Sequence, residues 1–356
     1  MSRWAEDPVA AADALICSAL EDLGALGKTL LVAPGPRVTA MAAAASSDAP
    51  DIWQRRCAIG RTDAAAEPPE GPFDTVLLRL PKGRAEQEMS LHLCLSRLGE
   101  GGRLVLYGGN DEGIRAASDK LARIARAIET LGTRGHGRIV AARRTGDMML
   151  RSHLADWRVA GTIDLGHGTR PWASYPGVFA GGALDAGTAL LLRALPALAA
   201  GARILDYGCG PGTIAAALAA RDQTLTPDML DADAVALVAA SENVPSGRII
   251  LGAGLSATRR ARYHLIVSNP PIHTGVREDH RTLERLITEA PPHLMPGGRL
   301  VLVVQRRIPL DRLLTTSFDT IDTLADDGRF RVWSASSPRE REAMKARRPR
   351  SGTTRD

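Results

Sequence analysis

The chain has 356 residues, which is long for one domain and sufficient for two domains with separate cores. Hydrophobic residues make up 44% and no uncharged apolar stretch reaches the length of a membrane span, so a mainly disordered chain and a membrane-spanning chain are excluded. The net charge of +5 comes almost entirely from arginine, which favours a polyanionic partner, although genomic base composition can produce the same bias.

The first residues, MSRWAEDPVA, lack the basic and apolar regions of a secretory signal, so we expect a cytoplasmic protein. The four cysteines lie far apart and form no CxxC pair: Cys17, Cys57, Cys94 and Cys209. This spacing argues against a structural zinc site and against a disulfide framework, and we expect no metal.

The sequence repeats itself. A glycine, an apolar strand, a Gly/Pro turn and an Ala-rich helical run begin at Gly27 and again at Gly201. The segments PFDTVLLRLPK and LSRLGEGGRLVLYGG likewise have the later counterparts RYHLIVSNPPI and PHLMPGGRLVLVVQ. The offset between counterparts grows slowly along the chain, as in a duplication with insertions in the second copy.

Each copy alternates short, continuous apolar runs with amphipathic helical stretches, which predicts an α/β fold with a doubly wound, mostly parallel sheet. We therefore expect two tandem Rossmann-like domains, 1–150 and 165–335. The Gly/Pro-rich segment between them is predicted to be a linker followed by the loop that leads into the second domain. The Arg-rich segment 336–356 has few apolar residues and is predicted to be a disordered basic tail.

In the second copy a glycine loop follows an apolar strand and precedes a predicted helix over 213–220. Its motif residues are Asp206, Gly208, Gly210 and Gly212. Glycines let the backbone turn sharply and leave room for a ligand, so we expect a small cofactor here. A tight turn without a ligand is the alternative.

Asp231 lies nineteen residues after Gly212, where the next strand is predicted to end and the next helix to begin. A carboxylate at this place in a doubly wound sheet accepts both hydrogens of a ribose diol. The alternative is that Asp231 only caps the following helix.

The loop departs from the dinucleotide fingerprint, because its third glycine comes one position early and Thr213 stands where a glycine is expected. Asp206 would repel a pyrophosphate but would suit the ammonium of a methionine moiety. The pattern D-x-G-x-G-x-G resembles motif I of the class I S-adenosylmethionine-dependent methyltransferases, and we prefer that cofactor to NAD.

At the end of the fourth strand of this copy stand Ser268, Asn269, Pro270 and Pro271. Strand ends of this kind face the ligand crevice. The Asn269 side-chain oxygen and the Pro270 carbonyl can accept the two hydrogens of a planar amine and orient its nitrogen toward a methyl donor. The run resembles the (Asp/Asn/Ser)-Pro-Pro-aromatic motif of methyltransferases that act on exocyclic or amide nitrogens; alone, Pro-Pro could simply end a strand.

Two neighbouring residues carry weaker expectations. His273 could help to deprotonate the product or contact nucleic acid, but a loop histidine often has no such role. Cys209 is small enough for the glycine loop, and we assign it no nucleophilic chemistry.

The segments YPGVFAGGALDAGTALLLRALP, DYGCGPG, SNPPIHTG and DDGRFRVWSA resemble, in order and spacing, the catalytic half of the ribosomal RNA small-subunit methyltransferase C family. The resemblance covers most of residues 25–335 and implies methylation of a guanine N2 in 16S ribosomal RNA, with S-adenosylmethionine as cofactor. It also implies that Phe179, Asp185 and Thr188 lie where the loop before the glycine motif closes over the methionine end; Asp185 and Thr188 could instead only start a helix.

The resemblance further implies that the first copy is degenerate. There, residues 33–36 replace the acid and the glycines, and residues 79–82 replace Asn-Pro-Pro. We expect this copy to bind no cofactor and to dock RNA or brace the fold, with Lys82, Arg84 and Arg115 as candidates for phosphate contact.

Two departures from relatives occur in the second copy. Ala253 stands where an acid often binds the adenine amine, and Ile272 replaces the usual aromatic residue, so apolar contact would replace stacking on the target base. The predicted substrate contacts are therefore Phe179, Ile272 and His273.

Rival functions remain at this point: an N-methyltransferase of adenine or of protein glutamine, and a non-catalytic RNA-binding assembly factor. The basic charge and the duplication favour RNA, and the intact Asp206, Asp231 and Asn269 favour an enzyme. We expect a monomer that acts on ribosomal RNA or on the small ribosomal subunit.

Overall fold

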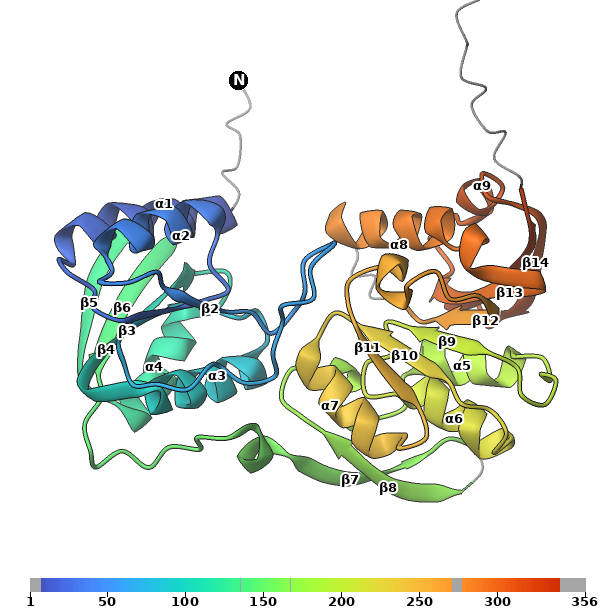
Figure 1. Ribbon diagram of the computed structural model, residues 1–356, viewed down its shortest axis with the longest axis horizontal. Helices are drawn as coiled ribbons and strands as arrows, with labels where there is room; N and C mark the ends of the chain where they lie inside the picture. The colour runs from blue at the N-terminus through green and yellow to red at the C-terminus, as the bar shows by residue number, and fades with distance from the viewer. Residues whose placement is uncertain (1–7, 135, 167, 271–276, 340–356) are drawn as a thin grey trace, which may run out of the picture.

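A computed structural model describes residues 8–134, 136–166, 168–270 and 277–339. Two large sheets form separate lobes (Figure 1). A two-stranded sheet comes from the part of the sequence that connects the lobes, and it lies against the second lobe. Within the described residues, no helix is long and apolar enough to cross a membrane.

The first lobe contains six strands in the order β2-β1-β3-β4-β6-β5. The strands are β1 (Thr29–Val32), β2 (Asp51–Trp53), β3 (Phe73–Arg79), β4 (Leu98–Gly109), β5 (Arg126–Arg134) and β6 (Gly137–Arg143), and the helices are α1 (Pro8–Asp22), α2 (Pro36–Ala45), α3 (Arg84–Ser96) and α4 (Ile114–Ile124). The first four strands are parallel, whereas β6 runs antiparallel to both of its neighbours.

The second lobe contains seven strands in the order β11-β10-β9-β12-β13-β15-β14. The strands are β9 (Ile204–Tyr207), β10 (Asp228–Asp231), β11 (Arg248–Leu251), β12 (Tyr263–Ser268), β13 (Leu294–Gln305), β14 (Phe318–Asp326) and β15 (Phe330–Pro338). Its helices are α5 (Ala186–Ala194), α6 (Thr213–Arg221), α7 (Ala234–Asn243), α8 (Arg277–Glu289) and α9 (Asp311–Leu314). Strand β15 runs antiparallel to its neighbours β13 and β14, whereas the other pairs of neighbouring strands in this sheet are parallel.

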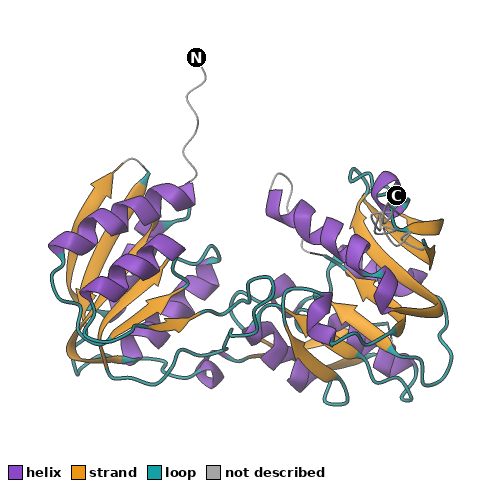
Figure 2. Ribbon diagram, turned by 45° about the horizontal axis from the view of Figure 1, so that its top comes forward, coloured by secondary structure: helices purple, strands orange, loops and turns teal. Residues whose placement is uncertain are grey.

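Helices cover both faces of each sheet, which explains the continuous apolar strands (Figure 2). In β9, for example, Ile204 packs in the cluster with α5, α6 and α7, whereas its neighbour Leu205 packs in the cluster with α8 and α9. Both faces therefore need apolar side chains, and the predicted doubly wound architecture is confirmed.

The two sheets share one topology. Strands β2, β1, β3, β4, β6 and β5 occupy the same order as β10, β9, β12, β13, β15 and β14, which confirms the duplication. The first sheet has no counterpart of β11: residues 54–72, all of them described, contain no helix or strand.

The structure corrects two boundaries. The predicted linker contains β8 (Thr169–Ser174), which pairs with β7 (Val159–Asp164) in a hairpin that packs on α7. The predicted tail begins inside β15, because residues 336–338 pair with their neighbours in the sheet. The rest of the tail, from 340 onward, lies outside the described residues.

Candidate active site

The glycine loop and the residues Asn269 and Pro270 lie side by side at the carboxyl ends of adjacent strands. Strands β9 and β12 are parallel, and Val267 is the partner of Asp206. The Ser268 hydroxyl donates a 2.7 Å hydrogen bond to the Tyr207 carbonyl, which ties the two strand ends together. Asn269 therefore lies beside the start of the glycine loop, as the sequence predicts.

The glycines of the loop serve two purposes. Gly208 has φ +67°, and a Cβ placed on it would meet no atom within 4 Å, so the backbone here borders open space. Gly212 has φ +84°, and its Cβ would lie 3.1 Å from Val244, beside α7. The first glycine therefore leaves room for a ligand, and the third allows close helix packing.

Asp206 is fully buried under the loop. Its Oδ2 accepts a 3.0 Å hydrogen bond from the Ala215 amide of α6, whereas its Oδ1 has no hydrogen-bond partner among the described residues. Burial raises the pKa of Asp206 to about 7. A buried carboxylate with one unpaired oxygen beneath the glycine loop fits a ligand that brings a cation or a donor.

Asp231 binds the loop instead of capping a helix. Its Oδ2 accepts from the Gly210 amide and its Oδ1 from the Asp233 amide, both at 2.8 Å. The cap of α7 is Asp233, whose side chain accepts from the first-turn amides of that helix. Burial raises the pKa of Asp231 to about 6, although these backbone donors oppose the rise. Each oxygen keeps a lone pair that could accept a ribose hydroxyl.

Asn269 is held in one orientation by two acceptors. Its Nδ2 donates to Asp185 Oδ2 at 3.0 Å and to Thr188 Oγ1 at 2.9 Å. Because a carboxylate can only accept, the amide nitrogen must face Asp185, and Oδ1 is presented on the opposite side. Asp185 also caps α5 by accepting from the Thr188 amide, so its helix-starting role is confirmed, whereas closure of this segment over the methionine end stays a prediction.

The remaining predicted site residues fall in three groups. Phe179 is 46% exposed and lies 3.7 Å, through its Cβ, from a Cβ built on Gly210, so it borders the glycine loop. Pro270 is described and buried, whereas Pro271, Ile272 and His273 lie outside the described residues. Cys209 is a buried free cysteine, and burial holds its pKa well above the usual value, which suits an inert thiol.

Sequence reasoning missed Asn243 at the end of α7. Its Oδ1 accepts from the Ala173 amide of β8, and its Nδ2 donates to the carbonyls of Ala173 and Pro211, all at 2.8–2.9 Å. This buried amide joins the β7–β8 hairpin to the glycine loop. A polar residue near the end of an apolar helix was the only signal in the sequence.

The corresponding crevice of the first copy is filled by its own side chains. Arg79 is buried and makes a bidentate ion pair with Glu112 at 2.7 and 2.8 Å. A Cβ on Gly35, at the start of α2, would meet the carboxylate of Asp13. Lys82, Arg84 and Arg115 are exposed near the same edge of the sheet.

Within the described residues, no group of three or more His, Cys, Asp or Glu side chains is arranged to hold a metal ion. The polar groups that converge in the crevice are therefore those of Asp206, Asp231, Asn269 and the glycine-loop backbone. This set can accept hydrogens and hold a cation, and it contains no nucleophile.

The strand order and the glycine loop define an α/β fold of the methyltransferase class. Residues 171–334 match the methyltransferase small domain family, and residues 15–139 match the N-terminal domain of methyltransferase small domain proteins. The fold is also similar to that of a T. thermophilus 16S rRNA N2 G1207 methyltransferase (RsmC) solved with AdoMet and guanosine, with a TM-score of 0.79, 22% identity and coverage of 94% of this chain and 93% of that one.

Relatives in sequence identify the family. The chain is 35% identical to the ribosomal RNA small subunit methyltransferase C of Pseudomonas aeruginosa strain LESB58 over 284 residues, which cover 78% of this chain and 83% of the relative. The proteins of that name from Ectopseudomonas mendocina and Aliivibrio fischeri are 34% and 28% identical, over 78% and 74% of this chain and 83% and 77% of their own lengths. The chain belongs to the ribosomal RNA small subunit methyltransferase C family.

Proposed function

We propose that the chain transfers a methyl group from S-adenosylmethionine to the exocyclic N2 of a guanine in 16S ribosomal RNA. The observation that carries the proposal is the orientation of Asn269, whose amide oxygen is turned out beside the glycine loop by Asp185 and Thr188. A planar amine needs such a fixed acceptor, because its lone pair is delocalised and must be aimed at the methyl carbon.

The chain's own residues divide the work. In the proposed site Asp206 pairs with the ammonium of the cofactor and Asp231 accepts the ribose hydroxyls. Gly208 leaves space for the adenosine, Gly210 donates its amide to Asp231, and Gly212 lets the turn pack closely against α7. When bound, S-adenosylmethionine supplies an electrophilic methyl group. Asn269 Oδ1 and the Pro270 carbonyl accept the two amine hydrogens and stabilise the positive charge that develops on nitrogen. Water takes the released proton, so no strong base is needed.

Further roles in this site extend the proposal. Pro271 keeps the turn extended, while Ile272, His273 and Phe179 contact the target base. Ala253, a neutral residue shortly after β11, leaves the adenine amine to be bound by backbone groups. We also infer a monomer, since the proposed site uses only residues of one chain, and a cytoplasmic enzyme, in keeping with a ribosomal RNA substrate.

Three arginines are suited to bind the RNA backbone beside this site. Arg306 and Arg307 directly follow β13, and Arg329 precedes β15, so they lie at the sheet edge where Asn269 also lies. They line a surface hollow together with Gln305 and Gly328. Lys82, Arg84 and Arg115 of the first copy, residues 1–150, are proposed to contribute in the same way.

The decisive experiment incubates the protein and labelled S-adenosylmethionine with small ribosomal subunits and with naked 16S ribosomal RNA, and then identifies the methylated nucleoside. N2-methylguanosine is the expected product. N6-methyladenosine or labelled protein would favour the rival amine substrates, and cofactor binding without label would favour an assembly factor.

The Thr188 hydroxyl tests how Asn269 is oriented. Thr188→Val removes one acceptor of the Asn269 amide in a buried site, so kcat should fall about tenfold, whereas Thr188→Ser should retain most activity. Titration of the Thr188→Val variant with S-adenosylmethionine distinguishes two roles of the Thr188 hydroxyl. An unchanged dissociation constant supports orientation of Asn269, and a raised one supports the direct cofactor contact predicted from the sequence.

Cofactor affinity should rise with pH between about pH 5 and about pH 8. The pKa values of Asp206 and Asp231 lie at about 7 and about 6, and both groups bind the cofactor in their ionised form. At a pH below its pKa, each group therefore has to release a proton when the cofactor binds. Calorimetry in buffers of different ionisation enthalpy measures that proton release. In Asp206→Asn the dependence should be shallower, and an equally steep profile would contradict the role of Asp206.

A further inference from the structure

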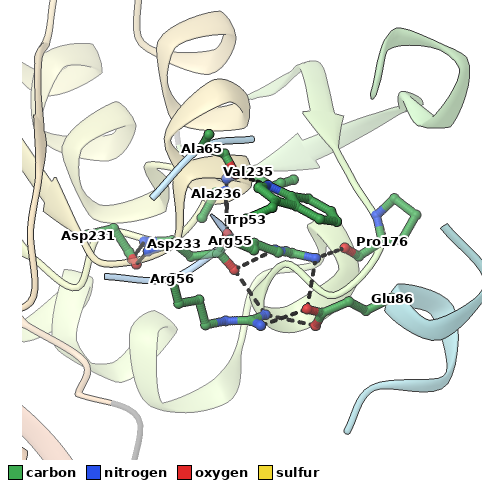
Figure 3. A network of polar contacts seen from close by, with 11 residues as sticks. Trp53, Arg55, Arg56, Ala65, Glu86, Pro176, Asp231, Asp233, Val235 and Ala236 are labelled. Atoms are coloured by element: carbon green, nitrogen blue, oxygen red, sulfur yellow. Dashed lines mark hydrogen bonds and ion pairs between the residues drawn. The ribbon is translucent and has the colours of Figure 1, made fainter. Parts of the chain in front are cut away.

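One segment of the first lobe lies directly on the loop that carries Asp231. Residues 54–57 leave the edge strand β2 and pair with residues 232–234, just before α7 (Figure 3). The Cys57 amide donates to the Ala232 carbonyl at 2.8 Å, and the Ala234 amide donates to the Arg55 carbonyl at 3.0 Å. The first lobe thus adds an isolated antiparallel bridge to the cofactor-binding loop.

Two adjacent arginines fasten this contact. Arg55 is buried, and its Nε donates to both oxygens of Asp233 at 2.8 and 3.1 Å, while its Nη1 donates to the Pro176 carbonyl at 2.8 Å. Arg56 makes a bidentate pair with Glu86 of α3 at 2.7 and 2.8 Å, and its Nη2 lies 3.0 Å from Asp233 Oδ2. One carboxylate from each lobe is therefore shared between the two arginines.

The network continues from Arg56 to the glycine loop. Asp233 binds Arg56 through its side chain, and its backbone amide donates to Asp231 Oδ1. Asp231 Oδ2 in turn accepts from Gly210. Apolar packing backs the same place, because Val235 and Ala236 of α7 belong to one hydrophobic cluster with Trp53. Two bonded steps thus separate Arg56 from the ribose-binding carboxylate.

We propose that Arg56, a residue of the catalytically degenerate copy, is a positioning residue of the cofactor site, which holds the 231–233 loop in place and keeps a positive charge beside Asp231. The inference rests on the proposed function, since Asp231 matters only if the crevice binds S-adenosylmethionine. Arg55 anchors the loop, whereas Arg56, with a side chain 46% exposed, supplies the charge that can be altered without leaving a buried hole.

Apart from Arg56, the surroundings of Asp231 disfavour its ionised form. Burial raises the pKa of Asp231, the neighbouring Asp233 adds to the rise, and the Arg56 guanidinium opposes it. Among the residues that the structure describes, the titratable and charged groups that face Asp231 are Asp206, Tyr207 and Cys209 from β9 and the glycine loop, Asp233 before α7, and Arg56 and Cys57 from the docked segment. Arg56 is the only cation in this set, so its removal should raise the pKa of Asp231 further.

The test compares S-adenosylmethionine binding by calorimetry in the full chain for wild type, Arg56→Gln, Arg56→Lys and the matched control Arg61→Gln. Arg61 lies on the same loop, and its ion-pair partner among the described residues is Asp63 at the surface. We expect Arg56→Gln to raise the dissociation constant about tenfold and to move the midpoint of its pH dependence upward. Arg56→Lys keeps the charge but loses the bidentate pair with Glu86, so its affinity should lie between those of wild type and Arg56→Gln while its pH midpoint stays near that of wild type. Arg61→Gln should be unchanged.

The outcomes separate the two proposals. Equal affinity in wild type and Arg56→Gln overturns the role of Arg56 while leaving the methyltransferase proposal intact. A weaker Arg56→Gln with an unmoved pH midpoint also overturns it, since this pattern indicates only a loosened fold. Tenfold weaker binding with a shifted midpoint supports it, even if wild type were to label a nucleoside other than guanosine. A wild type that binds no S-adenosylmethionine overturns both.

Discussion

Asn269→Ala should lower kcat for methyl transfer by about 10²- to 10³-fold while the dissociation constant of S-adenosylmethionine stays nearly unchanged. The side chain presents its oxygen toward the proposed target amine, and its nitrogen is fully engaged by Asp185 and Thr188. Alanine removes the acceptor, so the amine is no longer aimed at the methyl group. Single-turnover methylation of ribosomal RNA and cofactor calorimetry measure the two quantities separately.

Two substitutions at the same position sharpen this prediction. Asn269→Ser keeps a shorter acceptor and should retain more activity than alanine. Asn269→Asp keeps the acceptor but places a second carboxylate next to Asp185, so it should lose the fixed orientation and most of the activity. If Asn269→Ala bound the cofactor much more weakly, Asn269 would belong to the cofactor site, and the proposed division of roles would be wrong.

The second large effect is expected in the first lobe. Arg79→Ala should destabilise the first sheet by about 3–5 kcal/mol, because it leaves the Glu112 carboxylate in a largely buried place without its ion-pair partner. Hydrogen exchange of the peptides that cover β3 and β4 reports the opening free energy of this lobe by itself. Cofactor affinity should change little while this lobe stays folded, because Arg79 pairs with Asp13 and Glu112 and not with the residues that contact the 231–233 loop.

A double variant provides the control. Arg79→Met with Glu112→Leu removes both charges and retains most of the volume, so it should recover much of the lost stability. Were the first lobe to bind S-adenosylmethionine, Arg79→Ala would instead alter the number of sites found by calorimetry. That result would contradict the proposal that the first copy binds no cofactor.

The sequence was sufficient to predict the fold and the main-chain frame of the site. The strands are apolar throughout and do not alternate with polar residues, which predicted sheets covered on both faces. The repeated segments predicted the same strand order in both copies. Gly208, Gly212 and Asn269 could be placed because strand ends at neighbouring positions of a parallel sheet meet at one edge.

Contacts between distant residues could not be predicted. The amide of Asn269 takes its orientation from residues 81 and 84 positions earlier, and Arg55 meets Asp233 across 178 positions. Single arginines and aspartates on loops carry no periodicity that would indicate a partner. Asp185 and Thr188 were identified by resemblance, but their contact with Asn269 depends on tertiary structure.

The two boundary errors have local causes. The β8 segment is flanked by glycines and contains Pro171, which argues against a strand, yet a two-stranded hairpin consists of edge strands that tolerate proline. The end of β15 has polar residues, but antiparallel pairing with β13 and β14 depends on backbone groups and continues through Ser336.

The missing third strand of the first sheet has an evolutionary consequence. In the second copy the chain after β10 returns through α7 to β11. In the first copy the chain after β2 instead extends to the second lobe and pairs with it at Asp233. A gene that discarded the first copy, which we propose to be catalytically silent, would also discard the arginines that contact the 231–233 loop. In this proposal, selection for cofactor binding in the second copy also acts on residues of the first.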